Sequence, residues 1–183
     1  MGDVSVHADR EAVRMGLLRR DGLDGTRYRM REKLVSFGND AWIEAEDGQR
    51  VLRVDGKALR VRRTLHLETP SGERVLEAQQ RMLHLRQTMV LERDGHRVAT
   101  VHKALIAPMR DRWYIEVQDG RDLRVKGNIV DHEYEIERDG QKIAEISKRW
   151  FRVRDTYGIE IAPGEDEPLL LAAAVCIDEM ARR

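Results

Sequence analysis

The sequence predicts a mainly β protein in which a closed antiparallel β-barrel surrounds its own last helix. Three observations predict this fold. A hairpin-like unit is written at residues 89–103 and again 45 residues later, at 134–148. Asp-Gly dipeptides, a strong hairpin signal, recur between segments that alternate apolar and polar residues. The chain closes with an apolar segment, 168–178, that needs a core to cover it.

The bulk composition describes one charged, soluble-type domain. The 183 residues fit a single domain, and 33 Lys and Arg balance 33 Asp and Glu, which argues against a dedicated nucleic-acid binder. Cys176 is the single cysteine, so no intrachain disulfide forms, which fits a reducing compartment. The most apolar stretch, 169–177, is about half the length of a membrane span. We therefore expect a cytoplasmic protein without a transmembrane segment.

Residues 1–26 differ from the rest of the chain. Residues 9–20 are compatible with a short amphipathic helix, and Asp21-Gly22 and Asp24-Gly25 then break it. We interpret 1–26 as an N-terminal extension, flexible or partly helical. The barrel domain is then expected to occupy residues 27–183.

The repeated unit predicts antiparallel strands. Its two clear copies turn at Asp94-Gly95 and Asp139-Gly140, and looser copies turn at Asp47-Gly48 and Ser71-Gly72. Around 132–137, His132, Tyr134 and Ile136 alternate with three glutamates, so one face is buried and the other is wet. Further turns are expected at Asp55-Gly56, Asp119-Gly120 and Gly127-Asn128. The low repeat count and the different last element favour a barrel over a propeller.

The last element is predicted to be a helix at 168–182. Glu165, Asp166 and Glu167 precede it, where the helix dipole favours negative charge, and Pro168 suits the first turn. Its apolar residues cover most of the circumference, which is typical of a buried helix. A length of about 22 Å matches the height of a small barrel.

Several separated motifs carry a family resemblance. Residues 37–40, 127–136, 146–151 and 155–158 resemble the bacterial branch of the LURP-one-related family, within a match from about 28 to 180. That family is similar to the Tubby C-terminal domain and to phospholipid scramblases. The resemblance implies a barrel of about twelve strands around a central C-terminal helix. Its bacterial members have no established activity, whereas Tubby domains bind phosphoinositides through basic surface residues.

Basic residues gather near the ends of several predicted strands. Residues 50–63 hold six cations against Asp55, and residues 142–154 hold five against Glu145. If equivalent strands lie close together, these cations form an anion-binding patch, because Arg and Lys bind phosphate. The candidate patch consists of Lys103, Arg110, Lys148, Arg149, Arg152 and Arg154. The alternative is a solvated exterior whose cations pair across strands with Glu116, Glu133, Glu135, Glu137 and Glu160.

No catalytic constellation is visible. His132 stands between Asp131 and Glu133, but alternate residues of a strand point to opposite faces, so we expect a core or rim histidine. Cys176 lies in the apolar helix and is expected to be a buried, inert thiol. Metal-ligand spacings, nucleophile elbows and phosphate loops do not occur. We therefore predict no enzyme, no metal site and no cofactor.

The aromatic residues offer one weak nucleic-acid signal. Trp42, Trp113 and Trp150 fall in strand contexts and are expected in the core. In the run 149–152, Trp150 and Phe151 would point to opposite faces of a strand, which would leave one of them exposed beside arginine. Nucleic acid nevertheless stays an unfavoured partner, because the net charge is 0.

The leading hypothesis is a non-enzymatic binding module that docks on an anionic surface, either phospholipid at the inner membrane face or an acidic partner. The alternative is a protein-interaction scaffold or regulator that uses the N-terminal extension or a strand edge. A scramblase-like activity ranks third, because the last helix is too short to span a bilayer. A barrel filled by its own helix has no interior for a substrate, so binding is expected on the outside or at the rim.

Overall fold

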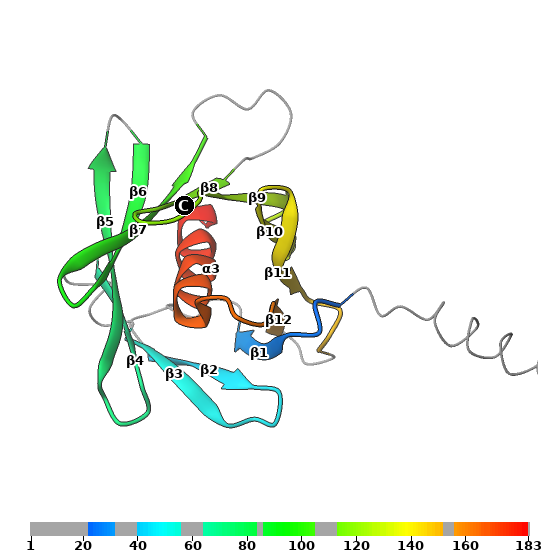
Figure 1. Cartoon of the computed structure of the whole chain (residues 1–183). Coiled ribbons are helices and arrows are strands. Elements are labelled where there is room, and N and C mark those ends of the chain that lie inside the picture. The colour runs from blue at the N-terminus through cyan, green and yellow to red at the C-terminus, as the bar shows by residue number, and fades with distance from the viewer. Residues whose placement is uncertain are drawn as a thin grey trace, which may run out of the picture.

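The computed structural model describes residues 22–31, 40–55, 64–83, 86–104, 113–151 and 156–182. Twelve strands surround one helix (Figure 1). In chain order the elements are β1 (Thr26–Arg31), β2 (Ala41–Ala45), β3 (Arg50–Asp55), β4 (Thr64–Glu68), β5 (Arg74–Leu83), β6 (Arg86–Arg93), β7 (His96–Lys103), β8 (Trp113–Val117), β9 (Leu123–Asn128), β10 (Glu133–Arg138), β11 (Gln141–Ser147), β12 (Thr156–Ile161) and α3 (Glu167–Ala181).

The strands form a closed antiparallel barrel. Each pairs with its neighbours in sequence, and β1 pairs with β12 to close the sheet, with Thr26 opposite Ile161. This confirms the predicted mainly β fold and its twelve strands. Every strand that the structure describes therefore has a partner on both sides. A closed barrel has no open strand edge, so the hypothesis that a partner protein binds along a strand edge is not supported.

The sequence repeat corresponds to two hairpins, β6–β7 and β10–β11. Their turn residues all have positive φ: 52° at Asp94, 76° at Gly95, 52° at Asp139 and 83° at Gly140. Two consecutive positive φ values are typical of the tight turn that suits the right-handed strand twist. The ladder register also shifts at the same repeat position, between Leu91 and Glu92 and between Ile136 and Glu137. The repeat thus encodes a β-bulge as well as a turn.

The same device occurs in two looser copies. The register of the β2–β3 pair shifts between Ile43 and Glu44, and that of the β4–β5 pair shifts between Leu67 and Glu68. A bulge bends its strand and increases the local twist. Four hairpins bent just before their turns help the sheet to curve into a closed wall.

Helix α3 fills the barrel (Figure 1). Eleven of its residues are buried, and all of them except Asp178 belong to one continuous core with the inward residues of the strands. Asp166 caps the helix by accepting a hydrogen bond from the Leu169 amide at 3.1 Å, and Pro168 occupies the first turn. The helix predicted at 168–182 is confirmed, and it begins and ends one residue earlier, at Glu167 and Ala181. It occupies the interior of the barrel.

The acidic turn before α3 fixes the helix to three strands. Glu165 forms a bidentate pair with Arg138 of β10, at 2.8 and 2.7 Å. Asp166 pairs with Arg93 of β6 at 2.9 Å. Glu167 accepts hydrogen bonds from Tyr28 and from Thr26 of β1. Bidentate Arg–carboxylate pairs are geometrically specific, so these contacts set the position of the helix within the wall.

Two sequence predictions about local structure are wrong. Gly127 and Asn128 end β9, and the β9–β10 turn comprises residues 129–132 instead. Gly127 is needed there because its φ is 127° and a Cβ would stand 2.5 Å from the Glu133 carbonyl oxygen. Trp42, which was expected in the core, is half-buried on the outer face of the barrel. The Cζ atom of Arg50 lies over its ring, 4.6 Å from the ring centre. Trp113 is in the core, as predicted.

The barrel has two ends, named here by the helix. At the proximal end α3 begins, even-numbered strands end, and the connections are tight turns; at the distal end α3 ends and odd-numbered strands end (Figure 1). His132 in the β9–β10 turn contacts Asp178 in the last turns of α3, which places that turn at the distal end.

Residues 1–21 lie outside the described part of the chain, and Gly25 packs against the Ile161 carbonyl group.

Candidate functional site

The described members of the predicted anion patch all lie at the distal end. Lys103 ends β7, and Lys148 and Arg149 directly follow β11. Both strands are odd-numbered, so they end at the same rim. Strands β8, β9 and β10 stand between them, which separates Lys103 from the other two along the wall. The predicted members Arg110, Arg152 and Arg154 lie outside the described residues.

Arg149 is a highly exposed member of this group. Its side chain is 81% exposed, and its Nε lies 3.3 Å from Glu133 Oε2. Glu133 also accepts hydrogen bonds from Ser147 Oγ at 3.0 Å and from the Lys148 amide at 3.1 Å. These bonds hold the start of the segment after β11 against β10. The guanidinium group therefore projects from a fixed backbone at the distal rim.

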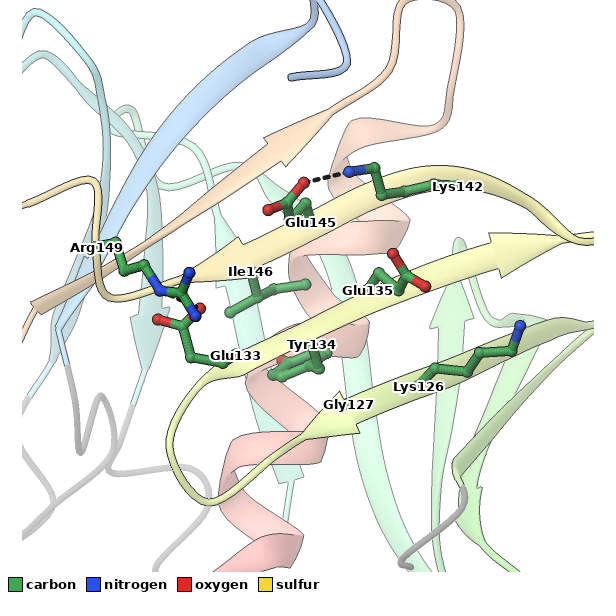
Figure 2. A pocket seen from close by; sticks show the side chains of 9 residues that line it. All are labelled: Lys126, Gly127, Glu133, Tyr134, Glu135, Lys142, Glu145, Ile146 and Arg149. Atoms are coloured by element: carbon green, nitrogen blue, oxygen red, sulfur yellow. Dashed lines mark hydrogen bonds and ion pairs between the residues drawn. The ribbon is translucent and has the colours of Figure 1, made fainter. Parts of the chain in front are cut away.

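A polar groove of about 380 Å³ lies on the outer face of β9, β10 and β11, next to Arg149 (Figure 2). Tyr134 and Ile146 close its floor, and both belong to the core on the inner side of the wall. The groove is lined by Lys126, Gly127, Glu133, Tyr134, Glu135, Lys142, Glu145, Ile146 and Arg149.

The charges in the groove are largely paired. Lys142 pairs with Glu145, and Lys126 pairs with Glu137 at 2.5 Å (Figure 2 draws the first of these). The Lys126–Glu137 and Arg149–Glu133 pairs follow the cross-strand alternative that the sequence left open, whereas Lys142 and Glu145 lie three residues apart in β11. On β12, Glu160 pairs in the same way with Arg27 at 3.4 Å. The groove therefore offers a mixed surface rather than a cluster of unpaired cations.

Two neighbouring carboxyl groups in β10 share a hydrogen bond. Burial, and then the hydrogen bond to Glu137, raise the pKa of Glu135 above its ordinary value. The ion pair with Lys126 lowers the pKa of Glu137. Of the two carboxyl groups, Glu135 is therefore the one that holds its proton to higher pH, and its protonated form donates to Glu137. Because folding raises the pKa of Glu135, ionising this group costs stability as the pH rises above its unfolded value.

The variant Glu135→Gln is expected to be more stable than the native chain at pH 7 and no more stable at pH 3. Gln can still donate to Glu137 but cannot ionise, so the loss that accompanies ionisation disappears. Thermal melts of both proteins between pH 3 and pH 8 measure the difference. A gap that stays constant over this range would show that the carboxyl group does not titrate as the structure implies.

The expectation of a core or rim histidine is confirmed, although His132 lies in the β9–β10 turn and not in a strand. His132 is buried, adopts a φ of 51°, and stacks on Tyr157 with ring centres 4.2 Å apart. Its Nε2 lies 3.6 Å from Asp178 Oδ1, and Arg182 Nη2 lies 2.6 Å from Asp178 Oδ2. Sequence analysis missed this contact. Its only sequence signal is Asp178, an acid within an otherwise apolar run, and the sequence does not show that the β9–β10 turn faces this acid.

The described part of the chain offers no exposed cysteine and no cluster of metal ligands. Cys176 is fully buried, and burial raises the pKa of its thiol, as expected for an inert residue. Within the described ranges, no three His, Cys, Asp or Glu side chains are placed to hold a metal ion. The described part of the chain also contains no helix of the length and hydropathy needed to cross a membrane.

The aromatic run after β11 is not a stacking platform. β11 ends at Ser147, and both Trp150 and Phe151 are half-buried. They pack over Gly158 of β12, where a Cβ would stand 2.7 and 2.6 Å from their rings. Arg27 covers the Trp150 ring at 5.3 Å. Neither ring is freely exposed, so the weak nucleic-acid signal loses its basis.

The fold and site define a closed antiparallel barrel with a central helix and a charged exterior. The LURP-one-related family model matches residues 26–178, so the chain belongs to the LURP-one-related family. A solved protein of Arabidopsis thaliana has a similar fold, with a TM-score of 0.62 and 16% sequence identity over 88% of this chain and 94% of that chain. No curated protein matches the sequence.

Proposed function

We propose that this protein is a non-enzymatic binding module that docks on anionic phospholipid through the distal end of its barrel. The observation that carries the proposal is the common position of Lys103, Lys148 and Arg149 at that end. Arg110 follows β7 in the sequence, and Arg152 and Arg154 follow β11, so we include them in the proposed patch. Guanidinium and ammonium groups near a membrane surface are attracted to acidic lipids by about 1 kcal/mol each.

The filled interior supports a surface function. Since α3 occupies the barrel, a ligand has the outer wall and the rims to bind. The groove beside Arg149 is shallow and its charges are paired, which suits a recognition surface more than a reaction site. Likeness to Tubby domains and phospholipid scramblases, within a bacterial branch of the family, adds a reason to choose lipid as the anion. The proposed location is the cytoplasm, with peripheral attachment to the inner membrane face.

Reversing charge at the distal end is expected to abolish most vesicle binding. The double variant Lys103→Glu, Lys148→Glu removes two cations, each worth about 1 kcal/mol, so the affinity should fall roughly 30-fold or more. Sedimentation with vesicles containing 30% phosphatidylserine measures it. The native protein is expected to bind these vesicles and not to bind vesicles of pure phosphatidylcholine. Its affinity should fall as the salt concentration rises, because salt screens the interaction.

A matched control has the same change in net charge at the other end. Arg97 and Arg121 are exposed at the proximal end, so the double variant Arg97→Glu, Arg121→Glu should keep nearly native binding. Melting curves establish that all three proteins fold. Equal losses in both double variants would refute the assignment to the distal end. Absence of native binding at physiological salt, together with binding to polyglutamate, would favour an acidic polypeptide partner over lipid.

A further inference from the structure

The distal end carries an outward-facing apolar residue. Val130 is 74% exposed and is the one large apolar side chain exposed to this extent among the residues that the structure describes. It lies in the β9–β10 turn, directly after the buried Ile129. A single exposed valine is unremarkable on most surfaces. Val130 lies at the same rim as Lys103, Lys148 and Arg149, however.

The turn holds Val130 in place. The His132 amide donates to the Ile129 carbonyl at 3.1 Å, and the Asp131 amide donates to Asn128 Oδ1 at 3.2 Å. Asn128 Nδ2 also donates to Asp131 Oδ2 at 2.6 Å, which engages the acid next to Val130. His132 is fixed below by its contacts with Asp178 and Tyr157. The apolar side chain therefore projects from a rigid tip.

The opposite end of the barrel is acidic. The turns at the proximal end and the connection from β12 to α3 contain nine acids and one arginine, a net charge of −8. Arg93 and Arg138 pair with two of these acids from the ends of their strands. The acids are Glu46, Asp47, Glu73, Asp94, Asp119, Asp122, Asp139, Glu165 and Asp166, against Arg121.

A neutral chain with an acidic end must be basic elsewhere. The net charge of the protein is 0, so the residues outside the proximal connections carry +8. Lys103, Lys148 and Arg149 at the distal end belong to those residues. The 15 residues of α3 span about 22 Å, which is more than two Debye lengths at physiological salt.

From this polarity we infer that the barrel docks end-on, with Val130 inserted among the lipid headgroups and the acidic proximal end facing away from the membrane. The inference rests on the proposed function, since it specifies how the same lipid surface is met. In this orientation the acids of the proximal end lie more than two Debye lengths from the negatively charged lipid surface. A barrel that lay on its side or pointed the other way would bring these acids next to the negatively charged lipids. Burial of one valine adds an apolar contribution that charge alone does not supply.

Fluorescent labels at the two ends test the orientation. Val130→Cys places a thiol at the distal tip, and Ser71→Cys places one on an exposed proximal turn. Cys176 is buried and does not compete for a polarity-sensitive dye. With vesicles containing 30% phosphatidylserine, the label at 130 should shift to the blue and gain intensity. The label at 71 should not change. A response at 71, or none at 130 while the protein sediments with vesicles, would overturn the end-on orientation and leave the proposed function standing.

An unlabelled variant tests the apolar contribution. Val130→Ser should bind the same vesicles roughly tenfold more weakly, because the apolar contact is lost while the charges remain. Its melting temperature should be native, since the side chain packs against little in the folded chain. Native affinity in this variant would contradict insertion of the tip. Failure of the native protein itself to sediment with anionic vesicles would instead refute the proposed function.

Discussion

A chain that ends at Pro163, and so lacks α3, is expected not to fold. Six large apolar residues of the helix are at most 8% exposed, and each contributes about 1.5–3 kcal/mol on burial. Their sum is of order 10 kcal/mol, which matches the whole stability of a typical domain. They are Leu169, Leu170, Leu171, Val175, Ile177 and Met180. Circular dichroism and amide NMR dispersion of the truncated chain measure the result.

A matched truncation separates loss of the core from loss of length. A chain that ends at Ala181 keeps every buried residue of α3 and loses the pair between Arg182 and Asp178. It should stay folded and lose about 1–2 kcal/mol, because the buried Asp178 loses a charged hydrogen-bond donor. A cooperative melt of the Pro163 truncation would show that the barrel wall is stable without its filling.

Replacing Gly127 with alanine is expected to destabilise the fold by about 3 kcal/mol or more. Gly127 has a φ of 127°, a backbone conformation that residues with a Cβ rarely adopt. The Cβ of an alanine at this position would also stand 2.5 Å from the Glu133 carbonyl oxygen. The obstacle is backbone of the paired strand, so β9 and β10 must separate locally to relieve it. Chemical denaturation of Gly127→Ala measures the free energy of unfolding.

Gly140 provides the control for backbone strain without the clash. Its φ is 83°, and a Cβ there would have no neighbour within 4 Å. Gly140→Ala should therefore cost about 1 kcal/mol, the ordinary penalty for a left-handed conformation. Equal losses in the two variants would mean that the close approach of β9 and β10 has no energetic weight.

The fold was largely predictable because its signals are local. Asp-Gly turns, strict alternation and an apolar last segment each depend on a few consecutive residues. The repeat even places Leu91 and Ile136 at equivalent bulges, although sequence analysis recognised the turns and not the bulges. The predicted turn at Gly127-Asn128 was wrong because glycine has two structural uses. It can permit a turn, or it can permit a close approach of two strands, and one sequence does not distinguish them.

The site was less predictable because charge pairing depends on register. Arg149 and Glu133 are 16 positions apart, and the contact requires β10 and β11 to pair with Glu133 beside Ser147. The pairing of Lys126 with Glu137 has the same origin across β9 and β10. Asp178 and His132 meet only because the helix enters the barrel. Residue counts along the chain reveal basic segments, whereas neighbours across strands decide which cations stay available.

Closure of the barrel by β1 and β12 has a consequence for synthesis on the ribosome. Thr26 pairs with Ile161, which is 135 residues later in the chain. At about 5–20 residues per second, β1 waits on the order of 10 s before its partner is translated, and α3 follows last. During that interval the nascent sheet has open edges and an uncovered apolar face. The period of greatest aggregation risk is therefore translation itself, and a slowed ribosome or a missing nascent-chain chaperone should reduce the yield of this protein.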